Sequence, residues 1–436
     1  MREVNLGICG VGTVGSGVVN VISRNIDLIN AKANCQINIH QIGCRRENPK
    51  INLDAIQVTK NIFDVANNPD INIIVELIGG TSVAHELVMT ALKNGKHVVT
   101  ANKALIAEHG MSIFAEAESR GLMVCFEAAV AGGIPIIKAL REGLSGNRIN
   151  WLAGIINGTT NFILSEMDNK GREFSDVLIE AQSKGYAEAD PTFDVEGIDA
   201  SHKLAILASI AFGTSLTLDG LFTDGITNLE PQDVSYAGEL GYVIKHLGIA
   251  RKTQSGIELR VHPTLIPDRC LIAGVNDVSN AIMVNADAVG TTLFYGPGAG
   301  SEPTASAVIA DIIDVARTMD SYPDSWMPPL GCGFSALKSI KITSIEDVET
   351  GFYIRFSALD KPGVLSDITK IMGDSGISIE AIIQREQPAG EMYVNVIILT
   401  NVTKEKYLEK AVKHIKDLET VRGNVNFIRV EYLDQC

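Results

Sequence analysis

The sequence predicts an α/β protein with three parts: a parallel, doubly wound sheet, a mixed α+β middle region and a C-terminal βαββαβ unit. Over the first 130 residues, short β-rich stretches alternate with stretches of helical periodicity, and this alternation favours a parallel sheet. A glycine-rich turn, GVGTVGSG, follows the first strand-like stretch at residues 10–17. Residues 351–436 contain strand and helix patterns in the order typical of the split βαββαβ arrangement.

The composition is that of a multidomain globular protein. The chain has 436 residues, of which 46% are hydrophobic and 20% charged, so it can bury a large core and is not globally disordered. Its net charge of −15 disfavours binding to nucleic acid or to an anionic membrane. No apolar run reaches the ~20 residues needed to span a bilayer. The seven cysteines are scattered and odd in number, which favours reduced thiols in a cytoplasmic protein.

Each element of the first 130 residues follows from a local pattern. An apolar run closed by glycine predicts the first strand, Val4–Cys9, and a helical pattern then continues to about Asn30. Four further β-rich runs predict strands at Ile37–Gly43, Ile71–Leu77, His97–Thr100 and Met123–Phe126. Helical spacing predicts helices at Ala84–Asn94 and Ile113–Arg120.

The turn after the first strand carries a dinucleotide-binding fingerprint. Gly10, Gly12 and Gly15 fit G-x-G-x-x-G between a predicted strand and a predicted helix, which is the context that this motif requires. The first glycine permits the tight turn, the second lets the backbone approach a pyrophosphate, and the third lets the helix pack closely on the sheet. The start of the helix then presents free N–H groups to a phosphate. The alternative is a glycine-rich turn that serves packing alone.

Two arginines follow the second predicted strand. In this fold, an acidic residue at that position favours NAD, whereas an arginine favours the 2′-phosphate of NADP. Arg45 and Arg46 stand there, somewhat further from Gly15 than is usual because the first helix is long. We therefore expect NADP(H) to be preferred and NAD(H) to be possible. The alternative is that both arginines are solvated loop charges.

Three further segments carry polar groups or exposed backbone. Lys103 follows a predicted strand in TANKALIA, at the sheet edge where ligands of open α/β folds bind, although a surface lysine at a helix start would look the same. The small residues of FEAAVAGGIPII at 126–137 expose carbonyls that could hold a monovalent cation, but their spacing alone favours a packing turn. The turn Asn157–Thr160 could line a substrate site or cap a helix.

An acidic segment that leads into an apolar helix is the most informative feature of the middle region. Residues 185–203 read GYAEADPTFDVEGIDASHK, and a helix is predicted from Ala200 to Gly213. Asp199 and Lys203 are spaced i, i+4 and share one face of that helix. A lysine beside a buried helix, with a carboxylate one turn earlier, can be aimed as a proton donor. The alternative is a surface ion pair worth ~0.3–0.5 kcal/mol, but a solvated acidic face should not continue directly into an apolar stretch.

The last third of the chain predicts one more helix and then the C-terminal unit. The glycine-rich segment 296–308 opens a helix that runs to about Met319, and the proline-rich Tyr322–Leu330 marks a boundary. A strand at 351–359 precedes a turn and an amphipathic helix that begins near Val364. The elements that follow are predicted as strand, strand, helix and strand at Ile377–Arg385, Met392–Leu399, Lys404–Leu418 and Val425–Glu431.

Together these motifs resemble those of the homoserine dehydrogenases. GVGTVGSGV, VELIGG, VVTANKALIA, FEAAVAGGIPII, GIINGTTNFIL, GYAEADPTFDVEGIDASHK and YGPGAGSEPTASAV occur in that family's order over nearly the whole chain. LDKPGVLSDIT looks like part of an ACT domain, a regulatory module that commonly binds amino acids. The resemblance implies a Rossmann-type parallel sheet domain, an α+β catalytic and dimerisation domain, and a ferredoxin-like ACT domain.

The resemblance also implies domain limits. It places a dinucleotide-binding domain at residues 1–130, completed by about 298–325, and a substrate-binding and dimerisation domain at 131–300. A linker is expected at 322–350 and the ACT regulatory domain at 351–436.

The activity implied by the resemblance is the reversible, NAD(P)H-dependent reduction of L-aspartate 4-semialdehyde to L-homoserine in threonine, methionine and isoleucine biosynthesis. Lys203 is expected to be the proton donor, Asp199 its companion in the substrate site, and Lys103 a residue that shares the proton work. Glu188 is expected to hold the substrate amine, supported by Asp194.

The resemblance implies two further sets of binding residues. The expected cofactor-binding positions are Gly10, Gly12, Thr13, Val14, Gly15, Arg45, Arg46, Lys103, Gly185 and Gly300. The expected site for a sodium or potassium ion uses backbone oxygens of Glu127, Val130, Gly132 and Ile134. An amino-acid effector, threonine or a related one, is expected at the Asp360–Val364 loop. A homodimer is expected, or a homotetramer if ACT units also pair.

Two alternatives from different classes remain open. An enzyme like aspartate-semialdehyde dehydrogenase would need a nucleophilic cysteine, and neither Cys125 nor Cys270 has an adjacent histidine in the sequence. A non-catalytic sensor of NADP and amino acids would not need the intact set of Lys103, Glu188 and Lys203. An aldehyde-dependent oxidation of NADPH would separate the enzyme from the sensor.

Overall fold

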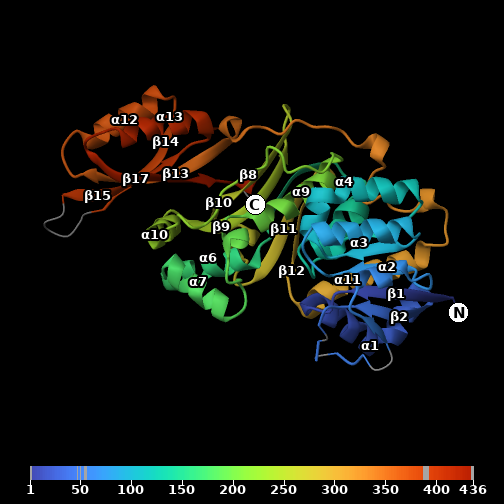
Figure 1. The fold of residues 1–436 in the computed structure, drawn as a ribbon. Coiled ribbons are helices and arrows are strands. Elements are labelled where there is room, and N and C mark those ends of the chain that lie inside the picture. Colours follow the sequence, from blue (N-terminus) through green and yellow to red (C-terminus); the bar gives the residue numbers. More distant parts are fainter. Residues whose placement is uncertain (1, 47, 50, 54–55, 386–391, 434–436) are drawn as a thin grey trace. The chain divides into compact units, whose positions relative to one another are not determined.

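The computed structural model of the chain describes residues 2–46, 48–49, 51–53, 56–385 and 392–433 (Figure 1). These residues form two compact units, which we describe one at a time. Unit 1 comprises Met1–Gly158, Asp199–Asp219 and Val278–Ile340. Unit 2 comprises Thr159–Ile198, Gly220–Asp277 and Lys341–Cys436.

Unit 1 contains the N-terminal sheet and three antiparallel strands. Its strands are β1 (Glu3–Cys9), β2 (Gln36–Gly43), β3 (Gln57–Thr59), β4 (Ile73–Glu76), β5 (His97–Thr100), β6 (Val124–Cys125), β7 (Ile149–Ile155), β11 (Ser279–Ala286) and β12 (Gly290–Pro297). Its helices are α1 (Thr13–Ala33), α2 (Ile62–Asn67), α3 (Ser82–Lys93), α4 (Lys103–Ser119), α5 (Ile136–Lys138), α9 (Ile198–Phe212) and α11 (Ser301–Thr318). Strands β7, β11 and β12 pair in antiparallel order.

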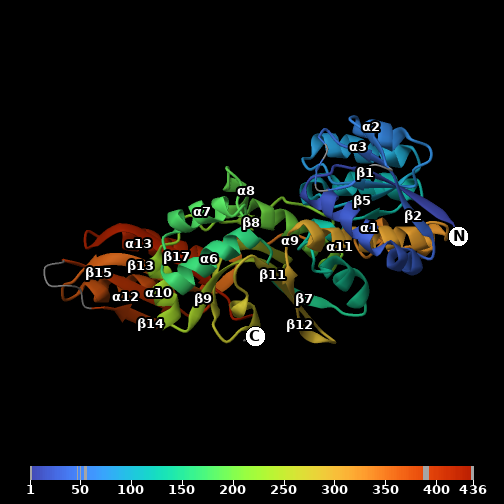
Figure 2. The ribbon, with the colours of Figure 1, turned by 90° about the horizontal axis from the view of Figure 1, so that it is seen from below.

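The N-terminal sheet is parallel throughout, as predicted. Its order is β3-β2-β1-β4-β5-β6, and each neighbouring pair is parallel. Figure 2 shows α2 and α3 on one side of these strands and α1 and α11 on the other. The strand order reverses between β1 and β4, and ligands of doubly wound sheets bind at such a switch point. The sequence analysis missed β3 and α2, which are only 3 and 6 residues long.

Helix α11 completes the core on one side of this sheet although it lies far along the chain. Val18 and Ile22 of α1 are buried in the same hydrophobic cluster as Val308 and Ile312 of α11. The two helices approach closely because Gly17 has no side chain: a Cβ atom there would lie 2.4 Å from the carbonyl oxygen of Ser301. The sheet is therefore covered by residues from both ends of unit 1.

Unit 2 contains the acidic segment and the C-terminal module. Its helices are α6 (Gly158–Lys170), α7 (Phe174–Ser183), α8 (Thr192–Val195), α10 (Pro231–Glu239), α12 (Val364–Asp374) and α13 (Glu405–Lys416). Its strands are β8 (Phe222–Thr223), β9 (Tyr242–Lys252), β10 (Ile257–Pro267), β13 (Glu349–Leu359), β14 (Ile379–Gln384), β15 (Tyr393–Thr400), β16 (Thr403–Lys404) and β17 (Val421–Val430).

The C-terminal module has the predicted βαββαβ order, and its sheet is shared with an earlier strand. Within the module the strands run β17-β13-β15-β14, and each pair is antiparallel. On its other side β17 pairs in parallel with β10, which in turn pairs with β9. This pairing was not predicted, because β10 and β17 are far apart in sequence and only three-dimensional packing brings them together.

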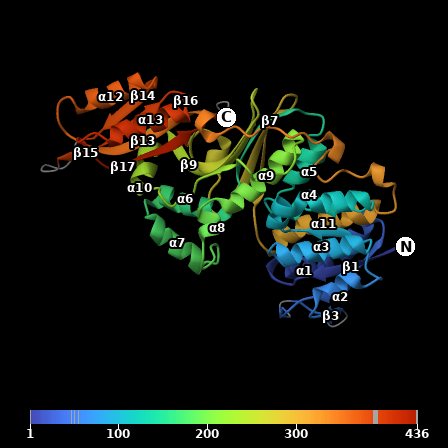
Figure 3. The same ribbon diagram turned by 45° about the horizontal axis from the view of Figure 1, so that its top comes forward.

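Both faces of the C-terminal sheet are buried. Alternate residues of β13, such as Ile354, pack with α12 and α13, which cover one face (Figure 3). Tyr353, on the opposite face, packs with Ile428 of β17 and Val234 of α10. A strand that is covered on both faces contributes apolar side chains to two layers of packing. This module is therefore part of the hydrophobic core of unit 2.

The described residues lack both a membrane-spanning helix and a cluster of metal-binding side chains. They include no helix that is both long enough and apolar enough to cross a membrane. The described residues also contain no group of three or more His, Cys, Asp or Glu side chains that could hold a metal ion.

The cysteines of the described residues differ in their bonding. Cys9, Cys35, Cys44, Cys125 and Cys332 are not disulfide-bonded, as expected for reduced thiols. Cys270 contradicts that expectation because it is disulfide-bonded; spacing in sequence does not reveal which thiols meet in the fold. Cys436 lies outside the described residues.

Candidate active site

Lys103 is the first residue of α4, at the carboxyl edge of the parallel sheet. Strand β5 ends at Thr100, and Asn102 caps the helix by accepting a hydrogen bond from the Leu105 amide at 3.1 Å. A lysine at a helix N-terminus lies beside the positive end of the helix dipole, where a cation is disfavoured. Its ammonium is instead held 3.0 Å from a carboxylate oxygen of Asp199. The buried acid thus compensates for the unfavourable position of Lys103.

Asp199 and Lys203 lie one turn apart on α9, as their spacing predicts. The Lys203 ammonium donates to Oδ2 of Asp199 at 2.7 Å and to the carbonyl oxygen of Ile156 at 2.7 Å. Its side chain is only 12% exposed, and that of Asp199 is 4% exposed. Lys203 is thus held inside the protein and does not point into bulk water. The structure brings Lys103, Asp199 and Lys203 together, and we call these three residues the lysine cluster.

The charge state of the lysine cluster follows from its environment. Burial alone would raise the pKa of Asp199, but the ammonium groups of Lys203 and Lys103 outweigh burial and hold this pKa well below its usual range. Asn157 adds to this effect by donating to Oδ2 of Asp199 at 2.8 Å. Asp199 is therefore a fixed anion that orients two amines, and it is not a proton donor.

The three fingerprint glycines have the three environments that their proposed roles require. Gly10 has a φ of +103°, and a Cβ atom there would lie 2.5 Å from the carbonyl oxygen of Leu77. A Cβ atom on Gly15 would lie 2.1 Å from the carbonyl oxygen of Gly10, so only glycine lets α1 start this close to the turn. A Cβ atom on Gly12, by contrast, would have none of the surrounding protein atoms within 4 Å. The backbone at Gly12 is therefore open to a ligand, and Thr13 and Val14 start the helix beside it.

The remaining predicted cofactor positions are spread over both units. Arg45 and Arg46 are exposed directly after the end of β2. Gly300 caps α11, and it lies near the fingerprint because the Ser301 hydroxyl donates to the Thr13 carbonyl at 2.6 Å. Gly185, which follows α7, belongs to unit 2.

Glu188 and Asp194 also belong to unit 2, on the segment between α7 and the end of α8. The Glu188 side chain is exposed. Its backbone carbonyl accepts a hydrogen bond from Gln182 at 3.1 Å, which ties the segment to α7. The Thr159 hydroxyl contacts Asp194 at 3.4 Å and donates to the carbonyl of Tyr186 at 2.7 Å. Thr159 thus connects the start of α6 to two points of the acidic segment, Tyr186 and Asp194.

The segment predicted to hold a cation makes a turn in unit 1. Ala131 and Gly132 both have positive φ, of +54° and +43°, and this reverses the chain direction. The Ile134 carbonyl accepts a hydrogen bond from Ile136 at 2.8 Å, and the Glu127 carbonyl accepts a long one from Val130 at 3.5 Å. Each carbonyl oxygen has two lone pairs, so each of these two carbonyls could accept its hydrogen bond and also bind a cation. The Glu127 carboxylate is engaged elsewhere, because it accepts hydrogen bonds from the amides of Ile137 and Lys138 and caps α5.

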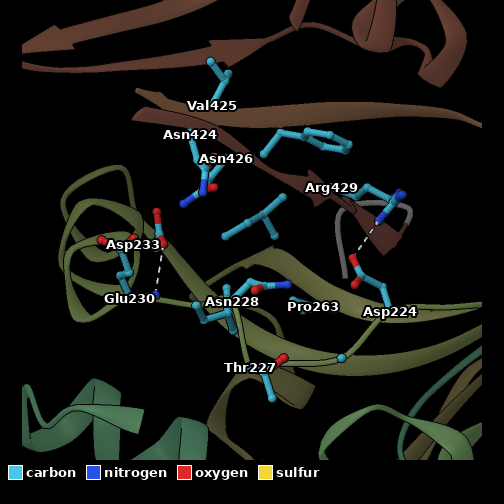
Figure 4. A pocket seen from close by; sticks show the side chains of 14 residues that line it. Asp224, Thr227, Asn228, Glu230, Asp233, Pro263, Asn424, Val425, Asn426 and Arg429 are labelled. Carbon is cyan, nitrogen blue, oxygen red and sulfur yellow. Dashed lines mark hydrogen bonds and ion pairs between the residues drawn. The ribbon is translucent and has the colours of Figure 1, made fainter. Parts of the chain in front are cut away.

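Two of the cavities in unit 2 adjoin the C-terminal module, and neither contains the lysine cluster. One, of about 540 Å³, lies between residues 224–233 and residues 424–429 of β17 (Figure 4). Figure 4 shows Asp224 and Arg429 facing each other across one end of it, 3.9 Å apart. The other, of about 320 Å³, is lined by the Asp360–Val364 loop together with Gln384 and Val396. The second cavity is where the sequence analysis expected an effector.

Sequence reasoning missed two groups: Asn157, which contacts the lysine cluster, and Glu76, which is buried at the end of β4. Asn157 was recognised only as part of a polar turn, and its bond to Asp199 could not be foreseen because the two residues are 42 positions apart. Glu76 was not considered at all, although it is a completely buried carboxylate at the end of β4. The signal in the sequence was a charged residue that ends the apolar run Ile73–Val75.

Family models match most of the chain. The model described as "Homoserine dehydrogenase" matches residues 135–313, and "Homoserine dehydrogenase, NAD binding domain" matches residues 10–127. The ACT domain model matches residues 352–420. A homoserine dehydrogenase from Pseudomonas aeruginosa is 58% identical over 434 residues, which cover all of both chains. The chain belongs to the homoserine dehydrogenase family. It is an NAD(P)-dependent oxidoreductase that acts on CH–OH groups, with a C-terminal ACT domain.

Solved structures of homoserine dehydrogenases share this fold. A homoserine dehydrogenase from Thiobacillus denitrificans superposes with a TM-score of 0.93 at 54% identity, covering 99% of this chain and 98% of the other. A hyperthermophilic archaeal homoserine dehydrogenase, solved in complex with NADPH, has a TM-score of 0.62 at 26% identity, covering 72% of this chain and 97% of the other. The predicted combination of a Rossmann-type sheet, an α+β region and an ACT domain is confirmed.

Neither Cys125 nor Cys270 offers a reactive thiol for the alternative aldehyde dehydrogenase chemistry. Burial raises the pKa of the Cys125 thiol to about 12, helped by the negative charge of Asp311, so the reactive thiolate is scarce at neutral pH. Cys270 is disulfide-bonded. Both observations agree with membership of the homoserine dehydrogenase family.

Proposed function

We propose that this enzyme reduces L-aspartate 4-semialdehyde reversibly to L-homoserine, with NADPH preferred over NADH, on the path to threonine, methionine and isoleucine. The observation that carries the proposal is the lysine cluster, in which one buried carboxylate orients two ammonium groups. Reduction of an aldehyde creates negative charge on its oxygen, and a positioned ammonium can stabilise that charge and supply a proton.

The fingerprint and its surroundings fit the cofactor. The open backbone at Gly12 and the N-terminus of α1 would hold the pyrophosphate, and Gly300 would lie beside them. When bound, the reduced nicotinamide supplies the hydride for the carbonyl carbon. Arg45 and Arg46, exposed after β2, would meet a 2′-phosphate. The NADPH complex of the archaeal relative supports the same cofactor for this chain.

Lys203 would act as the proton donor to the substrate oxygen. Its amine is fixed by Asp199 and by the Ile156 carbonyl, so little reorganisation is needed when charge develops nearby. In the reverse direction, the neutral amine would accept the hydroxyl proton of homoserine. Lys103, held by the other oxygen of Asp199, would share this work.

We assign further roles to two residues of unit 2 and to the 127–134 turn of unit 1. Glu188 is an exposed carboxylate that would bind the ammonium group of the substrate, and Asp194, in contact with Thr159, would support it. A sodium or potassium ion held by the carbonyls of residues 127, 130, 132 and 134 would fix the turn that carries them, since hard cations bind oxygen ligands. Such an ion would have a structural role and would take no part in proton transfer.

The ACT domain would make the enzyme responsive to an amino acid of the pathway, threonine or a related one. The cavity at the Asp360–Val364 loop is of a size suited to a small molecule, and the Asp360 carboxylate at its edge accepts a hydrogen bond from Gln384 at 3.2 Å. A homodimer, or a homotetramer with paired ACT domains, would be the working form.

The proposal is tested by following NADPH absorbance on addition of L-aspartate 4-semialdehyde. We expect oxidation that depends on the aldehyde, is reversed by homoserine with NADP⁺, and is inhibited by threonine. Absence of turnover with this aldehyde would favour the sensor alternative, whereas turnover that ignores every amino acid tested would remove the regulatory part alone.

Arg45→Ala tests the cofactor preference. We expect the KM for NADPH to rise by about 10-fold, because a charge-assisted contact to the 2′-phosphate is lost, and the KM for NADH to change by less than about 2-fold. Arg148→Ala, in the loop before β7, serves as the surface-charge control. An equal rise for both cofactors would exclude Arg45 from the 2′-phosphate.

A further inference from the structure

Glu76 is a buried carboxylate without an evident role in packing. It ends β4, whose other residues are apolar, and none of its surface is exposed. Thr100 donates a hydrogen bond to Oε2 at 2.5 Å, and the Ile78 amide donates one to Oε1 at 2.9 Å. Burial raises its pKa, although these hydrogen bonds oppose that rise. A buried acid is costly unless it is hydrogen-bonded, so Glu76 depends on its bonds to Thr100 and to the Ile78 amide.

A short hydrogen-bonded route leads from Glu76 to the start of α4. Glu76 and Thr100 are directly opposite each other on the paired strands β4 and β5. The Thr100 hydroxyl, which donates to Glu76, accepts from the Asn102 amide at 3.0 Å. Asn102 caps α4 with its side-chain oxygen, and its side-chain amide donates to the Gly80 carbonyl at 2.7 Å. Lys103 is the next residue.

This arrangement addresses a specific difficulty of the site. Lys103 occupies the first position of α4, where the helix dipole disfavours a cation, yet its ammonium has to stay 3.0 Å from Asp199. A helix start that frays or shifts would move that ammonium. Glu76 restrains the helix start through Thr100 and Asn102, and it places a carboxyl group close to the beginning of α4.

We propose that Glu76 is a positioning residue, which acts through Thr100 and Asn102 to hold the Lys103 ammonium against Asp199. This inference rests on the proposed function, because it matters for catalysis only if Lys103 takes part in the reduction. Glu76 itself touches neither substrate nor the reacting atoms in this proposal. Its contribution is geometric, and displacements of about 1 Å in an active site can cost up to about 10²-fold in rate.

The test is a double-mutant cycle between Glu76 and Lys103. Glu76→Gln and Thr100→Val should each lower kcat about 10-fold and leave the KM for NADPH within about 2-fold. Thr100→Ser, which keeps the hydroxyl, should restore kcat relative to Thr100→Val. In a Lys103→Met background, where no ammonium remains to be positioned, Glu76→Gln and Thr100→Val should lower kcat no further.

Other outcomes are equally clear. Independent, multiplicative losses of kcat in the double variants would overturn the positioning role, as would a raised KM for NADPH with an unchanged kcat. Wild-type kcat in Lys103→Met would instead refute the proposed role of Lys103, whatever the effect of Glu76→Gln.

Glu405→Gln serves as the control, because it removes an equally buried carboxylate in the ACT domain. It should lower thermal stability, and its effect on kcat should not depend on whether Lys103 is present. Thr100→Val changes no charge, so it keeps the test valid if Glu76→Gln does not fold.

Discussion

Two of the buried carboxylates among the described residues, Asp199 and Glu431, are each held between two cations but have different partners. In unit 1, Asp199 lies between Lys103 and Lys203. In unit 2, Glu431 lies between Arg251 and Arg260, and Arg260 also contacts Glu258. We call this second group the arginine network. Arg260 is completely buried, whereas the side chain of Lys103 is 34% exposed.

The difference between the two groups is the one expected between the proposed reactive site and a structural contact. A guanidinium is always charged and forms two parallel hydrogen bonds, so it suits a fixed, buried contact. An ammonium can lose its proton and keeps its charge on one small atom, so it can serve as an acid and as a base. The arginine network joins β10 to the residue that follows β17, and it therefore connects the ACT domain to the rest of unit 2.

The largest expected effect is at Lys203. We expect both Lys203→Met and Lys203→Arg to lower kcat by about 10³-fold, with NADPH binding near normal. Arginine keeps the ion pair with Asp199 but cannot supply a proton at neutral pH, so it distinguishes proton transfer from charge alone. Lys170→Met, which removes an exposed lysine paired with Glu166, is the control. Steady-state kinetics that showed high activity in Lys203→Arg would reduce the role of Lys203 to electrostatic stabilisation.

The next largest effect is expected in the arginine network. Glu431→Gln leaves the buried Arg260 with only one carboxylate, and we expect a loss of about 3 kcal/mol in the free energy of unfolding. The kcat of the folded protein should be unchanged within about 2-fold. Urea denaturation followed by circular dichroism measures the first quantity, and kinetics at low temperature measure the second. A stable Glu431→Gln variant with low kcat would mean that this network, too, serves the reaction.

The contrast between the two clusters also shows what the sequence could reveal. The Asp199–Lys203 pair was predicted because helical spacing is a local property, and the fingerprint because Gly10, Gly12 and Gly15 lie within one short turn. The contact between Arg260 and Glu431 joins residues 171 positions apart, and no periodicity in the sequence predicts it. The same holds for the parallel pairing of β10 with β17. A truncation after residue 335, reasonable for an independent regulatory unit, would therefore remove strands from the core of unit 2.

Glu76 shows the same limit within the active site itself. The sequence shows Glu76 only as a charge at the end of an apolar strand. Its proposed positioning role depends on the pairing of β4 with β5, which places it opposite Thr100. Local patterns thus pointed to the residues proposed to carry chemistry, whereas the residues proposed to position them emerged only from the three-dimensional contacts. Asn157, which supports Asp199 from the turn before α6, belongs to this second class.

The smallest expected effect is on the pH dependence of stability. It is measured by comparing wild type with Asp199→Asn, in which a neutral amide replaces the carboxylate. Because the pKa of Asp199 is lower in the folded protein than in the unfolded chain, its ion pairs stabilise the fold fully above the unfolded pKa of about 4. That stabilisation is lost as the pH falls through the lower, folded value. Below about pH 4, wild-type stability should therefore decrease more steeply than that of Asp199→Asn, by about 1.4 kcal/mol per pH unit.

Thermal denaturation of both proteins between pH 3 and pH 7 measures this difference. Asp199→Asn should be less stable than wild type at pH 7, and the two curves should converge as the acid side is approached. Parallel curves would mean that folding does not lower the pKa of Asp199, so its contacts with the two ammonium groups would add no stability. The orientation of Lys203 would have to come from the Ile156 carbonyl, and the parallel with Glu431 would be lost.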